Sequence, residues 1–412
     1  MQPAPLFTLA ILFGLLLDCN GDGEPSARVQ TSRITGGMPS LSAASPVVYL
    51  GVGGGCTGTV VAQNLILTAK HCVTDVIGAS YNCTETGDRF IDWEAGVVET
   101  TPDAGAFGAT RSPDRFRVGK AGSAAGAPRV ARVLVAPGTT LCTSDIAMLL
   151  LDRPLDDPSI APLRLDRGPS LGEPITATGW GLTSGKIQPA VLQRRATTVL
   201  EIGPWAKETR GAGPTAGPVP PHFFTIGEGL CHGDSGSPAL AWSGAVIGVA
   251  SGLDNPALVL PSGTATDCVG RGLRGLYEAT AAERDFILGA FAEAGATPWL
   301  EGQPDPRAQL KEFEASCAHD DECKSNVCVA ADRAPGRCSH GCLETVCPAG
   351  YQCAPLDGRP RCLPAVEAGT ELSPPPSPGG CVVANTRTSN FGAVLVLLAV
   401  ICLGRGLFQR IA

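Results

Sequence analysis

The hexapeptide Gly233-Asp234-Ser235-Gly236-Ser237-Pro238 places a serine between two glycines in a short turn. Glycines at such positions let the backbone turn sharply and expose two backbone N–H groups toward a substrate carbonyl oxygen. A serine hydroxyl is hardly ionised near pH 7, so a nucleophilic serine needs a general base. The base in turn needs a carboxylate that orients it. The hexapeptide therefore predicts a histidine and a carboxylate that act together with Ser235.

The chain offers one good candidate for each of these partners. It has five histidines, and His71 lies in Leu67-Thr68-Ala69-Lys70-His71-Cys72, beside a cysteine that can hold it in place. Asp145 lies in Thr143-Ser144-Asp145-Ile146-Ala147-Met148-Leu149, at the start of an apolar strand. These three residues occur along the chain in the order His, Asp, Ser. The order is Ser, Asp, His in α/β-hydrolases and Asp, His, Ser in subtilisins, so both of these classes are excluded. The hydrolase motif G-x-S-x-G also fails, because Ser237 stands where it requires glycine.

Residues 34–295 have the pattern of an all-β protein. The chain holds 52 glycines and 35 prolines, which favour turns and short strands over long helices. Helical spacing occurs only from about Ala281 to Ala294. Many short strands with turn signals predict barrels or a sandwich. The candidate strands are Val47–Leu50, Thr59–Val61, Leu65–Thr68, Ala131–Val135, Ile146–Leu151, Ile175–Thr178 and Ala245–Ala250.

These motifs resemble those of the chymotrypsin/trypsin-like serine peptidases, over about residues 33–295. The resemblance also rests on the junction Arg33-Ile34-Thr35-Gly36-Gly37, on Cys56 and Cys72 around the loop before the histidine, and on Thr178-Gly179-Trp180-Gly181. It implies two six-stranded antiparallel β-barrels with the site in the cleft between them. It also implies His71 as general base, Asp145 as its orienting carboxylate and Ser235 as nucleophile.

The resemblance further implies an oxyanion hole and activation by cleavage. The backbone N–H groups of Gly233 and Ser235 would form the oxyanion hole. Cleavage after Arg33 would free the amine of Ile34, and its ammonium would be buried against Asp234. Residues 20–33 would then be a short activation peptide.

The substrate pocket departs from that of trypsin. Gly229, six residues before the nucleophile, stands where a trypsin has aspartate, so no carboxylate holds a substrate Arg or Lys there. We therefore expect a small or medium apolar side chain at the P1 position of the substrate. His232 is expected to line the cleft. The pocket positions implied by the resemblance are Gly229, Leu230, Ser251, Leu253 and Gly275.

The 17 cysteines indicate export and two separately cross-linked domains. Apart from Cys19, Cys381 and Cys402 near the ends, six lie in the first 300 residues and eight in residues 317–362. The resemblance pairs Cys56 with Cys72 and Cys231 with Cys268. Cys83 and Cys142 both lie in an insertion between His71 and Asp145, and we expect them to pair.

The eight later cysteines predict a disulfide module over residues 305–365. Such a short segment buries too little apolar surface to fold unaided. Disulfides are favoured over zinc because paired C-x2-C elements are missing. The module resembles small secreted Cys-rich domains of the dickkopf-like or EGF-like kind, and its connectivity stays open.

Both ends of the chain have the composition of sorting segments. The apolar run Leu6–Leu17 predicts a signal peptide over residues 1–19, and Asp18 argues against a lipoprotein site at Cys19. Residues 366–385 form a Pro-rich linker with Gly379-Gly380-Cys381, followed by a hydrophobic segment with a basic tail over 386–412. This end resembles the MYXO-CTERM class of bacterial sorting signals, which implies processing or lipidation at Cys381. It predicts a protein at the bacterial cell surface or outside the cell, with membrane contact through the C-terminal segment.

The function expected from these features is a secreted or surface-anchored serine endopeptidase made as a zymogen, with protein or peptide substrates. The net charge of −8 argues against nucleic acid as a partner. No metal or organic cofactor is implied, and the acidic stretch His319–Glu322 is interpreted as a solvated turn rather than a calcium site. The alternative is a non-catalytic adhesion or recognition protein with a peptidase-like fold, in which the Cys-rich module binds an unknown partner.

Overall fold

The computed structural model describes the chain in segments: residues 37–40, 45–52, 55–77, 83, 105–119, 128–156, 158–182, 191–205, 218–254, 268–270, 272–329, 336–342, 347–356 and 359–365. The chain divides into two units, Met1–Ala365 and Val366–Ala412, and every described residue belongs to the first. The expected signal peptide, activation peptide, Pro-rich linker and C-terminal segment lie outside the described residues. Within the described segments, no helix has the length and apolar character needed to cross a membrane.

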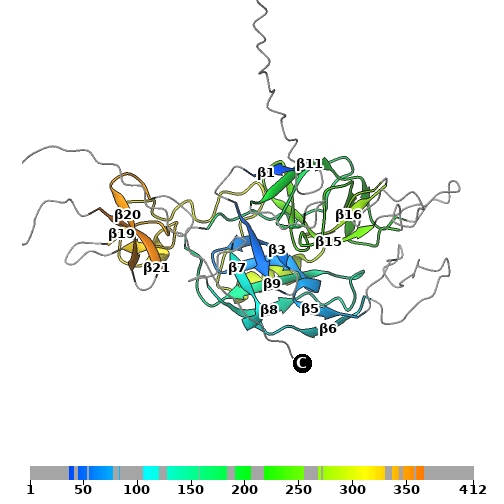
Figure 1. The fold of residues 1–412 in the computed structure, drawn as a ribbon, viewed down its shortest axis with the longest axis horizontal. Coiled ribbons are helices and arrows are strands. Elements are labelled where there is room, and N and C mark those ends of the chain that lie inside the picture. The colour runs from blue at the N-terminus through cyan, green and yellow to red at the C-terminus, as the bar shows by residue number, and fades with distance from the viewer. Residues whose placement is uncertain are drawn as a thin grey trace, which may run out of the picture. The chain divides into compact units, whose positions relative to one another are not determined.

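A six-stranded antiparallel sheet carries the first half of the fold (Figure 1). The apolar side chains of its central strands are almost completely buried, which explains the near-continuous hydrophobic runs in the sequence. A hairpin of β5 (Thr74–Val76) and β6 (Phe107–Thr110) pairs separately. The strands of the sheet, in spatial order, are β7 (Arg117–Gly119), β2 (Val47–Gly51), β3 (Cys56–Ala62), β4 (Leu65–Ala69), β9 (Ile146–Leu151) and β8 (Val130–Val135).

An eight-stranded antiparallel sheet carries the second half. Phe224 and Tyr277 stack in its core with ring centroids 5.4 Å apart. The strands, in spatial order, are β1 (Met38–Pro39), β11 (Gln193–Thr198), β10 (Pro174–Gly179), β14 (Pro238–Ala241), β15 (Val246–Asp254), β16 (Arg274–Ala279), β13 (Phe223–Ile226) and β12 (Glu201–Ile202).

All seven strands predicted from the sequence are present, but the second sheet differs from the expected six strands. The two-residue strands β1 and β12 extend its edges, and such short pairings leave little trace in a sequence. Among the described residues, the end strands of neither sheet pair with each other, so two closed six-stranded barrels are not seen.

One α-helix, α1 (Arg284–Glu293), lies inside the range expected to be helical. It buries Ile287, Ala290 and Phe291 in the core of the six-stranded sheet. Single-turn helices are η1 (Lys70–Cys72), η2 (Pro113–Arg115) and η4 (Asp320–Glu322). In η4 the His319 and Glu322 side chains form a capping box, as suits a turn-forming acidic stretch.

The Cys-rich segment folds around four disulfides in two sets. In each set the first cysteine pairs with the third at a sequence separation of 11 and the second with the fourth at a separation of 15, so a similar four-cysteine unit occurs twice. The pairs are Cys317–Cys328, Cys323–Cys338, Cys342–Cys353 and Cys347–Cys362. The strands are β17 (Ser316–Cys317), β18 (Cys328–Val329), β19 (Gly336–Cys338), β20 (Tyr351–Leu356) and β21 (Arg359–Pro364).

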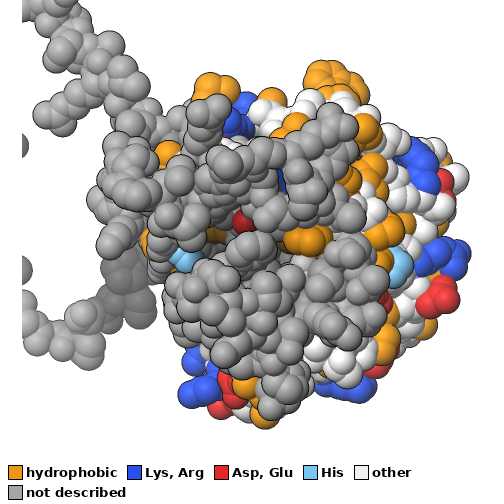
Figure 2. All heavy atoms as spheres, turned by 90° about the vertical axis from the view of Figure 1, so that its right-hand side faces the viewer, with side chains coloured by type: hydrophobic (Ala, Val, Ile, Leu, Met, Phe, Trp, Pro, Cys, Tyr) orange, Lys and Arg blue, Asp and Glu red, His pale blue; other side chains and the backbone are white. Residues whose placement is uncertain are grey.

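The surface of the described residues is mixed in character. On the face drawn in Figure 2, acidic and basic side chains lie among hydrophobic ones, and the described charges of one sign do not gather into a large patch. Among the large hydrophobic side chains that the structure describes, Trp242 is the most exposed, at 94%. It lies in the turn between β14 and β15.

Candidate active site

His71 and Asp145 meet because of the pairing of β4 with β9. Ala69 at the end of β4 is opposite Ile146 at the start of β9, so the residues just beyond lie side by side. His71 follows in η1, and Asp145 immediately precedes β9. The His71 ring nitrogen Nδ1 lies 2.7 Å from Asp145 Oδ2, and the His71 backbone N–H donates to Asp145 Oδ1 at 2.8 Å. Two contacts therefore fix the imidazole against the carboxylate.

The Asp145 carboxylate is completely buried and fully hydrogen-bonded. In addition to His71, the Ser251 hydroxyl donates to Asp145 Oδ2 at 2.6 Å. Burial alone would lower the pKa of His71, but the charge of Asp145 and its hydrogen bond outweigh burial and raise the pKa above the usual value. An imidazole in this setting accepts a proton readily, which is what a general base requires.

The Ser235 turn joins β13 to β14 and is held by both sheets. From β3 of the first sheet, the Thr57 backbone N–H donates to the Ser235 carbonyl at 2.8 Å. From β15 of the second, the Ala250 carbonyl accepts from Gly236 N–H at 2.8 Å. Gly236 has φ +82°, and a Cβ there would lie 2.2 Å from the Thr57 carbonyl oxygen, so only glycine fits.

Three groups of this turn have no hydrogen-bond partner among the described residues: the backbone N–H groups of Gly233 and Ser235 and the Ser235 hydroxyl. Two free N–H groups beside a serine form an arrangement that can bind an oxyanion. The Ser235 carbonyl oxygen lies 3.7 Å from the sulfur of Cys72, the neighbour of His71. Among the described residues the Ser235 hydroxyl forms no hydrogen bond with His71, and catalytic hydrogen bonds of this kind often tighten only when substrate binds.

Asp234 is buried directly behind this turn. Its carboxylate accepts the backbone N–H groups of Gly181 at 2.8 Å and Cys231 at 2.9 Å. Burial raises its pKa to about 7, despite these two hydrogen bonds. A Cβ on Gly179 would lie 2.0 Å from Asp234 Oδ1, and one on Gly181 would lie 2.4 Å from the carboxyl carbon. The two glycines of the Thr178–Gly181 motif thus make room for this carboxylate.

We expect Gly181→Ala to displace Asp234 and to lower the free energy of unfolding by about 2 kcal/mol, because overpacking of a rigid interior is destabilising. Urea unfolding measures this change. Gly168→Ala is the matched control, since a Cβ at Gly168 meets nothing within 4 Å. Equal stability of the two variants would contradict the packing of Asp234 against this motif.

The sequence that forms this site matches the model of a known protein family. The sequence model of the trypsin family matches residues 34–101 and 113–267, which is more than half of the chain. The chain belongs to the trypsin family. Its His71, Asp145 and Ser235 all lie within the matched residues.

This trypsin-family chain is similar to a curated protein and to a solved structure. Phenoloxidase-activating factor 3 of Holotrichia diomphalia is 26% identical over 204 residues, which are 46% of this chain and 52% of that protein. The chain thus spans about half the length of this relative. A solved structure, the scabies mite inactivated protease paralogue S-D1, is 14% identical with a TM-score of 0.39, covering 61% of this chain and 94% of that one.

A cavity of about 230 Å³ opens beside Ser235 in this trypsin-family domain. Its lining includes Leu230, Ser251 and Leu253, which were expected from the sequence, and the exposed His232. Gly229 and Gly275, the other two expected pocket positions, are buried and are not among the residues that line this cavity. For Gly275 the reason is packing, because a Cβ there would lie 2.9 Å from Leu230 Cδ1. The Leu230 side chain therefore fills the space beside Gly275.

The three disulfides expected in the trypsin-family domain are present. They join Cys56 to Cys72, Cys83 to Cys142, and Cys231 to Cys268. The first attaches η1, and with it His71, to β3. The second ends three residues before Asp145, and the third begins at Cys231 in the cavity wall. Cys56, His71 and Cys72 lie close enough to hold a metal ion, but both sulfurs are in the disulfide and are not thiolate ligands.

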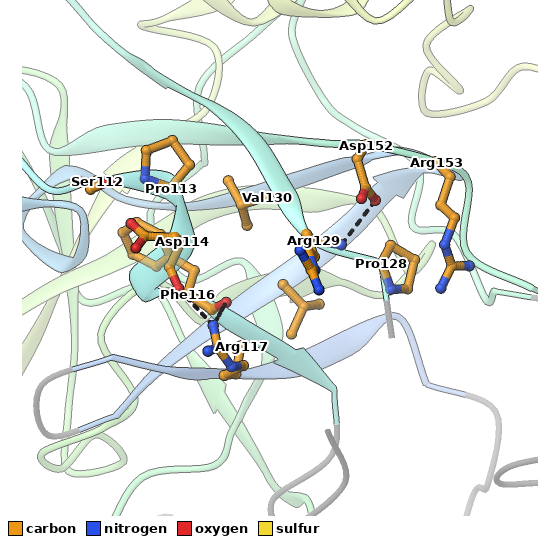
Figure 3. A pocket seen from close by; sticks show the side chains of 11 residues that line it. Ser112, Pro113, Asp114, Phe116, Arg117, Pro128, Arg129, Val130, Asp152 and Arg153 are labelled. Carbon is orange, nitrogen blue, oxygen red and sulfur yellow. Dashed lines mark hydrogen bonds between the residues drawn. The ribbon is translucent and has the colours of Figure 1, made fainter. Parts of the chain in front are cut away.

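A larger cavity of about 770 Å³ lies away from these residues (Figure 3). Its wall includes Arg117, Arg129 and Asp152, and none of the candidate catalytic residues. The Arg129 backbone N–H donates to Asp152 Oδ1 at 2.9 Å, and the Arg117 guanidinium donates to the Asp114 carbonyl at 2.6 Å. Both contacts are internal to the wall, and this cavity plays no part in the chemistry proposed below.

Two buried charged residues behind the site were missed from the sequence. Lys70 is 5% exposed and Glu278 is fully buried. Lys70 precedes His71 in an otherwise apolar stretch, and Glu278 ends the apolar run Leu276-Tyr277-Glu278 in β16. A single charge inside an apolar run is the signal that could have identified both.

Proposed function

We propose that this trypsin-family chain is an exported serine endopeptidase that hydrolyses peptide bonds through an acyl-enzyme on Ser235. His71 takes the proton of the Ser235 hydroxyl as its oxygen attacks the substrate carbonyl carbon. The N–H groups of Gly233 and Ser235 stabilise the oxyanion of the tetrahedral intermediate. Its collapse breaks the C–N bond, and His71 gives the proton to the leaving amine. A water molecule then hydrolyses the ester, with His71 again as base, while Asp145 stays ionised and keeps the imidazole oriented.

The observation that carries this proposal is the short contact between His71 Nδ1 and the buried Asp145 carboxylate, at 2.7 Å. It leaves the other ring nitrogen of His71 as the one available for proton transfer. The free N–H groups beside Ser235 support the same chemistry. A recognition protein without catalytic activity would have no need for this combination.

Activation by cleavage is the second part of the proposal. We infer that cutting after Arg33 frees the Ile34 ammonium, which pairs with Asp234. A carboxylate buried beside the Ser235 turn is a suitable partner, because an opposite charge offsets the cost of its burial. We infer from the disulfides and the expected leader that the protein acts outside the cell, with membrane contact through the C-terminal segment and an unknown partner for the Cys-rich module.

Peptide hydrolysis by the cleaved chain tests the proposed activity. Wild type should release product amine from a mixed peptide library, and an activated ester should give a burst that reports acyl-enzyme formation. Ser235→Ala should bind the same peptides without hydrolysing them. A correctly folded, cleaved wild type that hydrolyses none of the peptides would contradict the proposal.

The same library tests the specificity. Because Leu230 and Leu253 line the cavity beside Ser235, we expect the highest kcat/KM for peptides with Ala, Val or Leu at P1. The expected preference over Arg and Lys is at least about 100-fold, since position 229 carries no carboxylate and Asp234, which lies in the cavity wall, is buried and is proposed to pair with the Ile34 ammonium. Preferred cleavage after Arg or Lys would show that another acidic group reaches the pocket.

Stability measurements test the pairing of Ile34 with Asp234. In the uncleaved chain Asp234 has a pKa of about 7, against about 4 when unfolded. The folded precursor then holds the proton more tightly, so its free energy of unfolding falls as the pH rises from 4 through 7. After cleavage the Ile34 ammonium would lower the pKa of Asp234, so the free energy of unfolding would no longer fall over this pH range on account of Asp234.

We therefore expect urea unfolding between pH 5 and pH 8 to show a decrease in stability about 2 kcal/mol larger for the precursor than for the cleaved chain. Other buried acids, such as Glu278, contribute to both forms and cancel in the comparison. Equal decreases in the two forms would contradict the ion pair.

A further inference from the structure

Every polar atom of Asp145 has a partner in the structure. Its carboxylate contacts His71 and Ser251, and its carbonyl accepts the backbone N–H of Lys70 at 2.9 Å. Its own backbone N–H donates to Glu278 Oε2. Glu278 lies 133 residues further along the chain, in β16 of the other sheet. Of the groups that hold Asp145 in addition to His71, only Glu278 can gain or lose a proton within the ordinary pH range.

The Glu278 carboxyl is buried without full hydrogen bonding. Its residue exposure is zero, and its second oxygen, Oε1, has no partner among the described residues. The nearby Ser144 hydroxyl is likewise buried without a partner at hydrogen-bonding geometry. Burial, with the negative charges of Asp145 and Glu283, raises the pKa of Glu278 well above its usual value, although the Asp145 N–H and the Ser144 hydroxyl act in the opposite direction.

The positive groups nearby do not neutralise Glu278 by direct contact. The Lys70 ammonium donates to the carbonyl oxygens of Ala136, at 2.6 Å, and Gly138, and lies 4.5 Å from the centre of the Phe107 ring. Within the described part of the chain it forms no ion pair with Glu278. His71 is occupied by Asp145. An ionised Glu278 would therefore be a buried, unpaired charge next to a second carboxylate, which is costly.

We propose that Glu278 is a positioning residue of the peptidase reaction: a neutral carboxylic acid that holds the backbone of Asp145 so that its carboxylate faces His71. A neutral acid supplies an acceptor for the buried N–H without a second negative charge beside the base. An ionised group would stabilise protonated His71 and hold the base in its inactive form at neutral pH. The proposal rests on the proposed peptidase function, because it assigns Glu278 a part in that reaction.

Two substitutions separate the acceptor from the charge. Glu278→Gln keeps an oxygen acceptor of the same reach and cannot ionise, whereas Glu278→Met keeps the length and loses the acceptor. The pKa of His71 is measured by NMR titration of the resting protein, which needs no turnover, and kcat and KM are measured on the cleaved chain. Glu301→Gln is the control. In the native protein Glu301 Oε2 lies 2.5 Å from Arg164 Nε, and Glu301 contacts none of the catalytic residues. The substitution therefore weakens an ion pair away from the site.

We expect Glu278→Gln to keep kcat within about twofold of wild type, with an unchanged pKa of His71. For Glu278→Met we expect kcat to fall about 10- to 100-fold at unchanged KM, as when a catalytic group is misplaced. The pKa of His71 should fall with it, because the Asp145 carboxylate no longer faces the ring. Glu301→Gln should lose stability without changing either quantity.

Two results would overturn the proposal. If a folded Glu278→Met variant has the same kcat and the same His71 pKa as wild type, the contact between Glu278 and Asp145 does not position the Asp145 carboxylate. A fall of about one unit in the His71 pKa of Glu278→Gln would show that the native group is ionised. If the Met variant does not fold, the Gln variant decides alone. If wild type hydrolyses no peptide, the proposed function fails, while the NMR titration still tests how Glu278 acts on His71.

Discussion

Asp145→Asn lowers the kcat of the cleaved chain about 10,000-fold and leaves KM nearly unchanged, if the triad is as proposed. The side chain keeps its shape, but an amide in this place no longer favours the ring tautomer that leaves the outer nitrogen free to accept a proton. The amide also removes the charge that raises the pKa of His71. Initial-rate kinetics on the best peptide of the library measure both parameters.

A surface aspartate serves as the matched control for this substitution. Asp75 is exposed and pairs with Arg111 at 3.3 Å, on the strand that follows the His71 helix. Asp75→Asn makes the same chemical change and should keep kcat within about twofold, since exposed ion pairs contribute little. An Asp145→Asn variant that retains more than a tenth of the wild-type kcat would contradict the assigned role of Asp145.

Arg33→Gln blocks the proposed activation and reduces kcat/KM about 100- to 1,000-fold, the range expected when an oxyanion-hole donor is lost. Without cleavage the Ile34 ammonium cannot form, and Asp234 keeps its proton up to about pH 7. His71 and Asp145 should keep their contact in the precursor. The measurement compares both chains after exposure to the same activating protease, with the new N-terminus sequenced.

Arg28→Gln is the control for the cleavage site, because Arg28 lies five residues earlier in the same expected activation peptide. It should be cleaved after Arg33 and reach wild-type activity. A fully active Arg33→Gln, or a wild type that is active with an N-terminus other than Ile34, would show that activation does not depend on this junction.

The sequence predicted the parts of the site that local motifs encode. His71 and Asp145 each flank an apolar strand, and antiparallel pairing of those two strands is enough to bring them together. All three disulfides of the trypsin-family domain are present: two follow the family pattern, and the third joins the two cysteines of the insertion between His71 and Asp145. The apolar strands were found because buried strands in a β fold are short and continuous in hydrophobicity.

Features that depend on contacts between distant segments were not predictable. A single charge in an apolar run could have marked Glu278 as buried, but its partner could not be predicted, because the Asp145 N–H lies 133 residues away in the chain and meets Glu278 only in the folded protein. The role of Ser251 as a donor to Asp145 was likewise missed, although the residue itself was placed in the pocket wall. The packing of the Leu230 side chain against Gly275 also depends on the folded structure and could not be predicted from the sequence.

The most direct test of the central claim is reaction of the cleaved chain with a fluorophosphonate, followed by mass spectrometry of its peptides. Such probes modify only a serine activated by its neighbours. We predict one adduct, on Ser235 in Gly233–Pro238, and none in Ser235→Ala. A folded chain with Ile34 at its N-terminus that takes up no probe, or takes it up at another residue, would contradict the account.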